Sequence, residues 1–213
     1  MTNTLKNSSS GLRTGIRSLV LCVLLTATTP ALSNEAPWTL EKEEEQVQLY
    51  TRPVAGSPFL EVKATTLINA PIARVVEAFG TGEGCSAWRA ICKSSEIISA
   101  VSDTESYVYL VLDMPWPLSD RDMVIHSKAH IDQAARTVTV QLEPASSKHP
   151  ATDYVRAESS GEYTVKELSE QQVELTFIMH TDLRGDLPPE AINPRVADST
   201  LTDVLALRRL TEK

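Results

Sequence analysis

The alternation of apolar and polar residues predicts a chain built mostly of β-strands. Segments 47–54 and 59–68 are separated by the turn residues Gly56-Ser57-Pro58, and we expect them to pair as a hairpin. Seven later segments have strand composition: 95–101, 106–112, 121–131, 137–143, 154–157, 161–168 and 173–183. Strands do not alternate with helices here, which disfavours a doubly wound parallel sheet.

Helical periodicity is strongest in two other segments. Ala70-Pro71 opens the first helix, because proline is tolerated at the first helical position, and glycines 80 and 82 end it. Its apolar face comprises Ile72, Val75, Val76 and Phe79. The second helix covers residues 195–210, and its apolar face comprises Ala197, Leu201, Val204 and Leu205, widened by Leu207 and Leu210.

Two further segments are expected to be short elements. Residues 36–46 suggest an acidic helix held down by Trp38, with its glutamates in solvent. Residues 84–93 suggest either a short helix or a tight loop. The predicted order is therefore helix, two strands, one or two helices, six or seven strands and a long helix.

An α+β fold, in which a curved antiparallel sheet wraps around the C-terminal helix, satisfies this order of elements. Such a sheet leaves a space between its concave face and the helix. The strand faces expected to point inward include Met123 and Ile125 in one strand and Val173, Leu175, Phe177 and Met179 in another. These faces carry almost no titratable group, which favours an apolar cavity over acid–base chemistry. A fully packed core would need the same residues, so the pattern leaves both possibilities open.

The first 33 residues differ from the rest of the chain. They hold three basic residues and no acid, followed by a short apolar run and the small residues Ala31 and Ser33. This pattern is typical of a secretory signal peptide, so we expect residues 1–33 to be cleaved and 34–213 to function in the periplasm. An uncleaved membrane anchor is the alternative, but the apolar run is shorter than the roughly 20 residues that span a bilayer.

Charge and missing motifs exclude several classes of function. The formal net charge is −8, and removing three basic residues with the leader lowers it to −11. An acidic domain without a basic stripe is not expected to bind nucleic acid. The common zinc and glycine-rich nucleotide-binding signatures are absent from the sequence.

Residues 114–122, Met-Pro-Trp-Pro-Leu-Ser-Asp-Arg-Asp, resemble the PWPLSxRD segment of START domains, a family of lipid-transfer proteins. Ala70-Pro71, Trp88, Gly185-x-Leu187-Pro188 and Ile192-Asn193 follow the family pattern in the same order. The resemblance covers roughly residues 36–210. It implies the helix-grip fold with a hydrophobic tunnel that binds one lipid or other hydrophobic small molecule, without catalysis and without a cofactor. We expect a monomer that makes at most transient contact with a membrane.

The residues expected to contact the ligand come from the strand faces, the long helix and the motif. They are Trp88, Tyr109, Trp116, Arg121, Met123, Ile125, Phe177, Met179, Leu201, Val204 and Leu205. Trp116 is interpreted as a core plug, a tunnel wall or an exposed side chain. Arg121 is interpreted as a structural ion-pair partner or as the contact for a lipid headgroup, because a buried arginine needs a carboxylate or several carbonyl groups. The long helix, with a strand-connecting loop, is expected to form a lid.

Cys85 and Cys92 are the only cysteines after residue 33, and an oxidising compartment favours a disulfide between them. Seven residues of straight helix rise about 10 Å, more than a disulfide spans, so the segment must bend or the thiols stay free.

Two other functions stay open at this stage. An enzyme would need an acid or base facing inward, and Tyr107, Tyr109 and Asp113 are the nearest candidates. A ligand-free interaction module would instead have a filled tunnel and an exposed apolar patch. The four histidines have no metal-binding spacing and are interpreted as surface or structural residues.

Overall fold

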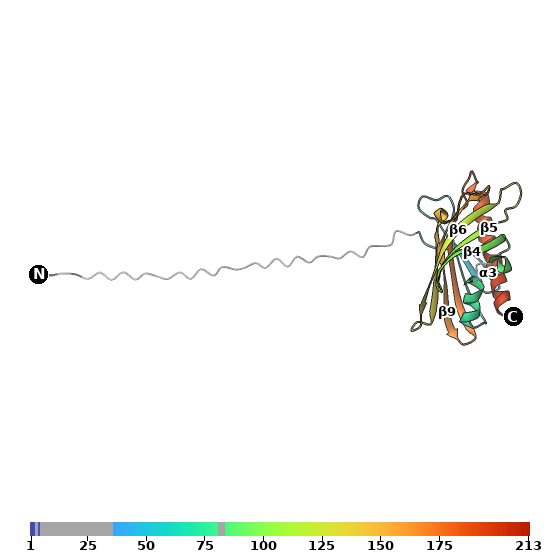
Figure 1. The fold of residues 1–213 in the computed structure, drawn as a ribbon. Coiled ribbons are helices and arrows are strands. Elements are labelled where there is room, and N and C mark those ends of the chain that lie inside the picture. The colour runs from blue at the N-terminus through green and yellow to red at the C-terminus, as the bar shows by residue number, and fades with distance from the viewer. Residues whose placement is uncertain (3, 5–35, 81–83) are drawn as a thin grey trace. The chain divides into compact units, whose positions relative to one another are not determined.

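Ten strands form one curved sheet that lies against the long helix α3 (Pro189–Thr211) in the computed structural model (Figure 1). The structure describes residues 1–2, 4, 36–80 and 84–213. The arrangement confirms the predicted fold class, a curved antiparallel sheet around a C-terminal helix. The signal peptide predicted over residues 1–33 lies outside the described residues except at three positions, so it stays a prediction.

Antiparallel pairing orders nine of the strands as β1-β2-β3-β10-β9-β7-β6-β5-β4, and the short β8 pairs in parallel with β6. Both sheet edges are therefore made of strands from the N-terminal half of the chain. The bounds are β1 Thr39–Glu44, β2 Val47–Arg52, β3 Glu61–Ile68, β4 Cys92–Ser102, β5 Glu105–Leu112, β6 Arg121–Asp132, β7 Thr137–Pro144, β8 Val155–Arg156, β9 Glu158–Ser169 and β10 Gln172–Asp182.

The helix predicted over residues 36–46 is wrong, because β1 occupies this segment at the edge of the sheet. Glu45 and Gln46 both have positive φ and form a two-residue turn that folds β1 back onto β2. The Trp38 ring lies 4.3 Å from the Arg52 guanidinium and 4.7 Å from the Lys63 ammonium. Backbone pairing and these cation–π contacts override the helical preference of the glutamate run, although its side chains are exposed as expected.

Three α-helices occur in the described part of the chain. Helix α1 (Ile72–Gly80) follows Pro71 as predicted, and the short α2 (Cys85–Trp88) begins the bent segment before β4. Helix α3 starts six residues earlier than predicted and includes Pro194. The early start is stabilised by Ile192, which is buried against Phe59 and Leu183. None of the helices described is long and apolar enough to cross a membrane.

The main hydrophobic core lies between the sheet and α3. The inward face predicted for β10, Val173, Leu175, Phe177 and Met179, is buried along its whole length. Side chains from β2, β3, β7 and β9 pack beside it, and α1 and α3 cover them. A second cluster at β5 and β6 contains Met123 and Ile125, so the predicted inward face of β6 is confirmed there.

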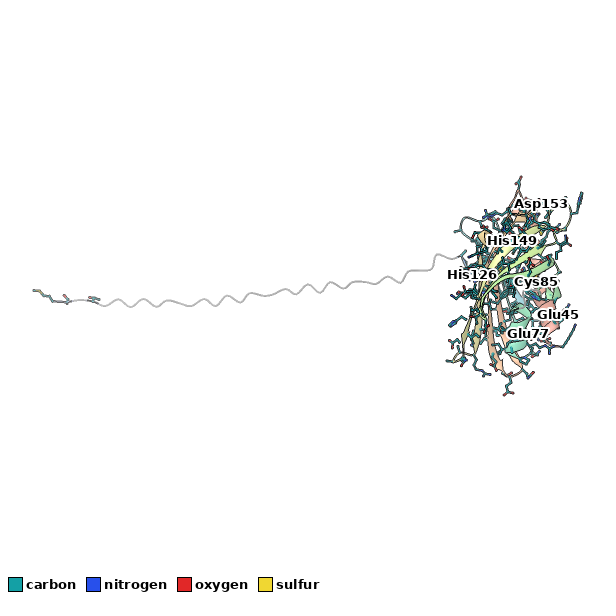
Figure 2. All side chains as sticks on the ribbon, in the orientation of Figure 1. Glu45, Glu77, Cys85, His126, His149 and Asp153 are labelled. Atoms are coloured by element: carbon teal, nitrogen blue, oxygen red, sulfur yellow. A yellow bond between two sulfur atoms is a disulfide. The ribbon has the colours of Figure 1, made fainter. Side chains whose placement is uncertain are left out.

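Strand β5 is covered on both faces near its C-terminal end, as its two apolar faces predict, and Leu110, Val111 and Leu112 are all buried. On the outer face, Tyr107 stacks on His126 and Tyr109 stacks on His149, with ring centroids 4.7 and 4.1 Å apart. Both histidines are labelled in Figure 2. They thus have structural roles outside the core.

Candidate functional site

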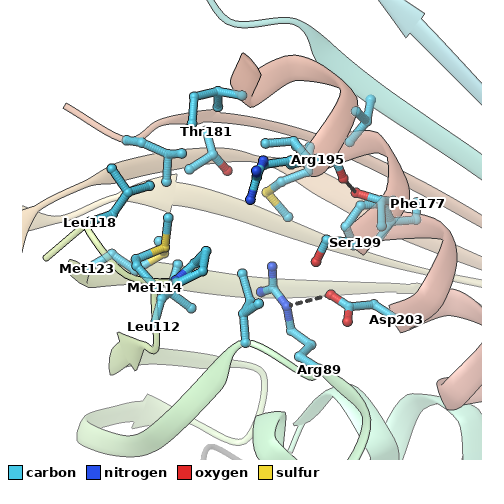
Figure 3. A pocket seen from close by; sticks show the side chains of 18 residues that line it. Arg89, Leu112, Met114, Leu118, Met123, Phe177, Thr181, Arg195, Ser199 and Asp203 are labelled. Carbon is cyan, nitrogen blue, oxygen red and sulfur yellow. Dashed lines mark hydrogen bonds and ion pairs between the residues drawn. The ribbon is translucent and has the colours of Figure 1, made fainter. Parts of the chain in front are cut away.

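A cavity of about 190 Å³ lies between the N-terminal half of α3, strands β6 and β10, and the loop 113–120 (Figure 3). We call it the main cavity. Twelve of its eighteen lining residues are apolar, so it is suited to a hydrophobic ligand. They are Val62, Ile91, Leu112, Met114, Pro115, Leu118, Met123, Phe177, Met179, Leu183, Ile192 and Val196.

A second cavity of about 90 Å³ lies next to the main one, toward α1 and α2. Arg89, Met123 and Met179 line both cavities, so the two adjoin at these side chains. Its other walls are mostly apolar, and they include Trp88 and Tyr163. The hydroxyl of Ser95 is buried there without a hydrogen-bond partner in the described structure.

Arg89 and Asp203 form an ion pair in the wall of the main cavity, and neither residue was among those predicted to contact the ligand. Arg89 Nε lies 3.4 Å from Asp203 Oδ2, and the Ala90 N–H donates to Asp203 Oδ1 over 3.2 Å. Burial raises the pKa of the Asp203 carboxyl, and its contacts with Arg89 and Ala90 offset this only in part. The available signal was an aspartate inside the apolar stripe of a helix, between Leu201 and Val204.

Five of the predicted ligand contacts line the cavities. Phe177 lines the main cavity, Trp88 and Ile125 line the second, and Met123 and Met179 line both. These residues come from α2, β6 and β10, so the alternation of the strands correctly indicated which side chains face the space.

Leu201, Val204 and Leu205 do not line either cavity. All three are buried in the main core against the sheet. The face of α3 that borders the main cavity contains instead Ile192, Arg195, Val196, Ser199, Thr200 and Asp203. The most apolar stripe of this helix packs into the closed core, whereas the stripe along the cavity wall includes polar residues, so a ligand contact at these three residues stays untested.

Trp116 is 93% exposed and lines neither cavity, so it is neither a core plug nor a tunnel wall. The Leu118 N–H donates to the Pro115 carbonyl over 3.0 Å, which closes a four-residue turn. That turn directs Leu118 toward the cavity and leaves Trp116 in solvent at its mouth. Tyr109 also lies outside the cavities, on the outer face of β5, where its hydroxyl donates to Asp122.

Arg121 and Asp122, which end the motif, are buried and hydrogen-bond to neighbouring loops. Arg121 donates to the backbone carbonyls of Ser119, Leu183 and Arg184. Arg121 has no ion-pair partner among the described residues and lines neither cavity, and its contact with a lipid headgroup stays a prediction. Its carbonyl partners fix the connection between β10 and α3 against the motif.

Asp122 accepts two hydrogen bonds from Arg156, over 2.8 and 3.0 Å, and one from Thr152 over 2.7 Å. Arg156 also donates to the carbonyls of Ser146, His149 and Pro150. This network fastens the segment between β7 and β9 to the outer face of the sheet.

Cys85 and Cys92 form the expected disulfide, with their Cα atoms 5.9 Å apart. The distance conflict of a straight helix is resolved because α2 ends at Trp88 and the chain then turns into β4. Cys85 is labelled in Figure 2. The bridge closes the short loop that carries Arg89 and Ile91, so it fixes the part of the chain that forms one cavity wall.

The candidates for acid–base catalysis are outside the cavities. The two cavities are lined by other residues, and none of these three candidates contributes: Tyr107, Tyr109 and Asp113. Within the described residues, no group of three or more His, Cys, Asp or Glu side chains is placed to hold a metal ion.

Comparisons with known proteins agree with this geometry. The sequence matches the model of the START domain family over residues 19–210. An uncharacterised protein of Pseudomonas aeruginosa is 27% identical over 178 residues, which cover 83% of this chain and 87% of that protein.

Two solved structures show the same arrangement. A STAR-related lipid transfer protein of Xanthomonas axonopodis is 29% identical, has a TM-score of 0.75, and is matched over 83% of this chain and 99% of that chain. Human StAR-related lipid transfer protein 5 is 18% identical with a TM-score of 0.73, over 82% of this chain and 86% of that chain, a likeness in fold.

Proposed function

The chain belongs to the START domain family, and from this premise we propose that it binds one lipid or other hydrophobic small molecule in the main cavity. The observation that carries the proposal is a largely apolar cavity that lies between the sheet and α3. The similar protein of Xanthomonas axonopodis is described as a lipid transfer protein. Transfer of an acyl chain from water into such a space contributes about 0.8 kcal/mol per buried CH₂ group, so binding needs no covalent step.

We propose binding rather than catalysis, because the cavities offer little acid–base chemistry. Their ionisable lining residues include an arginine–aspartate pair, a second arginine and the buried Tyr163, whose pKa is raised by burial. Arginine stays protonated at all physiological pH values and is therefore a poor proton donor or acceptor.

The loop 113–120 and the first turns of α3 form the side of the cavity through which a ligand enters in this proposal. Met114, Pro115 and Leu118 line the cavity from the loop, and Ile192 and Val196 line it from the helix. Both segments face solvent on their other side, with Trp116 and Pro117 exposed. They replace Leu201, Val204 and Leu205 as the candidate lid.

Trp116 is the candidate for transient contact with a membrane. An exposed indole beside the mouth of an apolar cavity is suited to the membrane–water interface, where tryptophan is enriched. The acidic character of the domain favours uncharged or zwitterionic lipid surfaces. Trp116→Ala should reduce co-sedimentation with phosphatidylcholine vesicles, and undiminished co-sedimentation would contradict this role.

The periplasm is the proposed site of action, and a monomer is the proposed form. The leader pattern of residues 1–33 supports export, and the Cys85–Cys92 disulfide is compatible with an oxidising compartment.

A substitution that fills the cavity tests the proposed function. Ser199 lies on the cavity face of α3, and Ser199→Trp should occupy the space and abolish binding of a fluorescent long-chain probe. Thr202 is exposed on the same helix, so Thr202→Trp is the matched control and should bind like the parent protein. Equal binding of the probe by both variants would contradict placement of the ligand in the main cavity.

A further inference from the structure

We propose that the ligand is a single-chain amphiphile with an anionic head, and that Arg89 and Arg195 bind this head at the polar end of the main cavity. The proposal rests on the proposed function and specifies the chemistry of its ligand. Four observations support it: the charge balance of the cavity wall, the unpaired donors that face the space, the gathering of polar lining residues on one side, and the size of the cavity.

The described lining of the main cavity carries more positive than negative charge. Its ionisable residues are Arg89, Arg195 and Asp203, two cations against one carboxylate. Asp203 is already engaged by the Ala90 N–H and by Arg89 Nε, and burial further disfavours its charged form. An anionic ligand would complete the balance, whereas a cationic head would add a third positive charge.

Arg195, which is exposed to solvent, and Arg89 bring donors without a protein partner to this end of the cavity. Arg195 makes no hydrogen bond or ion pair with any other side chain in the described structure, although Asp198 and Asp203 lie on the same helix. Arg89 approaches from the opposite wall and uses only Nε in its contact with Asp203 (Figure 3). The two guanidinium groups thus offer free N–H donors to a group between them, and planar forks of this kind match a carboxylate or phosphate.

Four charged or polar lining residues gather on one side of the main cavity. Arg195, Ser199 and Asp203 follow one another at helical spacing on α3 and face Arg89, whereas Leu112, Met123 and Met114 lie away from them on the side of β5 and β6 (Figure 3). This separation suits an amphiphile whose head lies between the arginines and whose tail extends toward Met123 and the second cavity.

The cavity volume favours one acyl chain. The main cavity holds about 190 Å³ and the adjoining one about 90 Å³. Both are smaller than the roughly 300–1,000 Å³ of pockets for drug-sized ligands, so a phospholipid with two acyl chains is disfavoured. A fatty acid and a monoalkyl phosphate share the required chemistry, an anionic head on a single tail.

The test compares four probes with the same tail: dodecanoate, dodecyl phosphate, dodecanol and dodecyltrimethylammonium. Each ionic probe is kept below its micellar concentration, and dodecanol below its solubility limit. Affinity is measured by calorimetry for the parent protein and for Arg195→Gln. Because a hydrogen bond to a charged group contributes about 1.5–3 kcal/mol and 1.4 kcal/mol is tenfold in affinity, Arg195→Gln should weaken the anionic probes about tenfold. It should leave dodecanol binding unchanged.

Two further variants sharpen the test. Arg74 is an exposed arginine on α1 away from both cavities, so Arg74→Gln controls for the loss of one positive charge and should bind every probe like the parent protein. Asp203→Asn removes the competing carboxylate and should strengthen the anionic probes but not dodecanol. Comparison of dodecanoate with dodecyl phosphate then shows which anionic head is preferred.

The outcomes separate this inference from the proposed function. Dodecanol could bind as tightly as the two anionic probes, with no change in the affinity of any of the three in Arg195→Gln. That result would overturn the proposal of an anionic head but leave the proposed hydrophobic binding site in place. If none of the probes binds, the inference falls together with the proposed function.

Discussion

Two buried aspartates of this chain have environments that shift their pKa values in opposite directions. Burial by itself favours a higher pKa for both carboxyl groups. At Asp122, hydrogen bonds from Arg156, Thr152 and Tyr109 outweigh burial, and the pKa lies below its usual value. At Asp203, one long contact with Arg89 and one backbone N–H do not outweigh burial, and the pKa is raised. Asp122 is therefore suited to be a permanent structural anion. Asp203 is instead a carboxyl group whose hydrogen bonds offset its burial only in part, and it lies beside the main cavity.

The raised pKa of Asp203 predicts a pH-dependent contribution to stability. An aspartate in the unfolded chain titrates near 3.9, so above about pH 3.9 the folded protein retains a proton that the unfolded chain has lost. The contribution of Asp203 to the free energy of unfolding should be greatest below that pH and should fall as the pH rises to the folded-state pKa.

The variant Asp203→Asn has no carboxyl group to titrate at this position. Urea unfolding of the parent protein and of this variant at a series of pH values therefore isolates the contribution of Asp203. The stability of the parent protein relative to Asp203→Asn should decrease as the pH rises from about 4. A difference that increases with pH would show that the Asp203 pKa is lowered and that its pair with Arg89 outweighs burial.

At the scale of elements, hydrophobic patterning predicted the β2–β3 hairpin, helix α1 and the strands from β4 to β10. The pattern worked best where one face of a strand lies in the core, as it does along β10. It failed at β1, where an exposed edge strand has no buried face to leave a signal. It also started α3 too late, because Pro194 resembles a helix boundary although Ile192 anchors an earlier turn in the core.

Strands β9 and β10 approach each other closely at Gly161, and this predicts a specific intolerance. A Cβ atom at Gly161 would overlap the carbonyl oxygen of Ile178, which belongs to the backbone and has little room to move. Gly161→Ala should therefore lower the free energy of unfolding by about 2 kcal/mol or more, since the strand must shift to relieve the clash.

Gly56 provides the control, because it also has positive φ but an added Cβ there meets open space. Gly56→Ala should cost only about 1 kcal/mol, the backbone term alone. Denaturant unfolding compares the two variants, and equal losses would mean that the β9–β10 contact at Gly161 is looser than described.

For the molecule as a whole, the sequence predicted the type of site better than its residues. The motif at 114–122 and the order of elements indicated the fold and an apolar space, and the structure contains both. Strand alternation placed Met123, Phe177 and Met179 correctly. Sequence patterns did not identify three lining residues of the main cavity, Arg89, Arg195 and Asp203. Their position depends on the rotation of α3 and on a loop bent by a disulfide. Of the three alternatives for Trp116, the structure has the exposed side chain, and the sequence could not decide among them because turn geometry, rather than hydrophobicity, sets its direction.

Native mass spectrometry of the protein, isolated without detergent from the cells that produce it, is the most direct test of ligand binding in the main cavity. We expect one bound amphiphile per protein chain, which organic extraction releases. It should be absent from Ser199→Trp and present in Thr202→Trp. The same spectrum should show a chain without residues 1–33. A mass that corresponds to the protein without ligand, and that does not change after addition of dodecanoate and dodecanol, would contradict ligand binding in the main cavity.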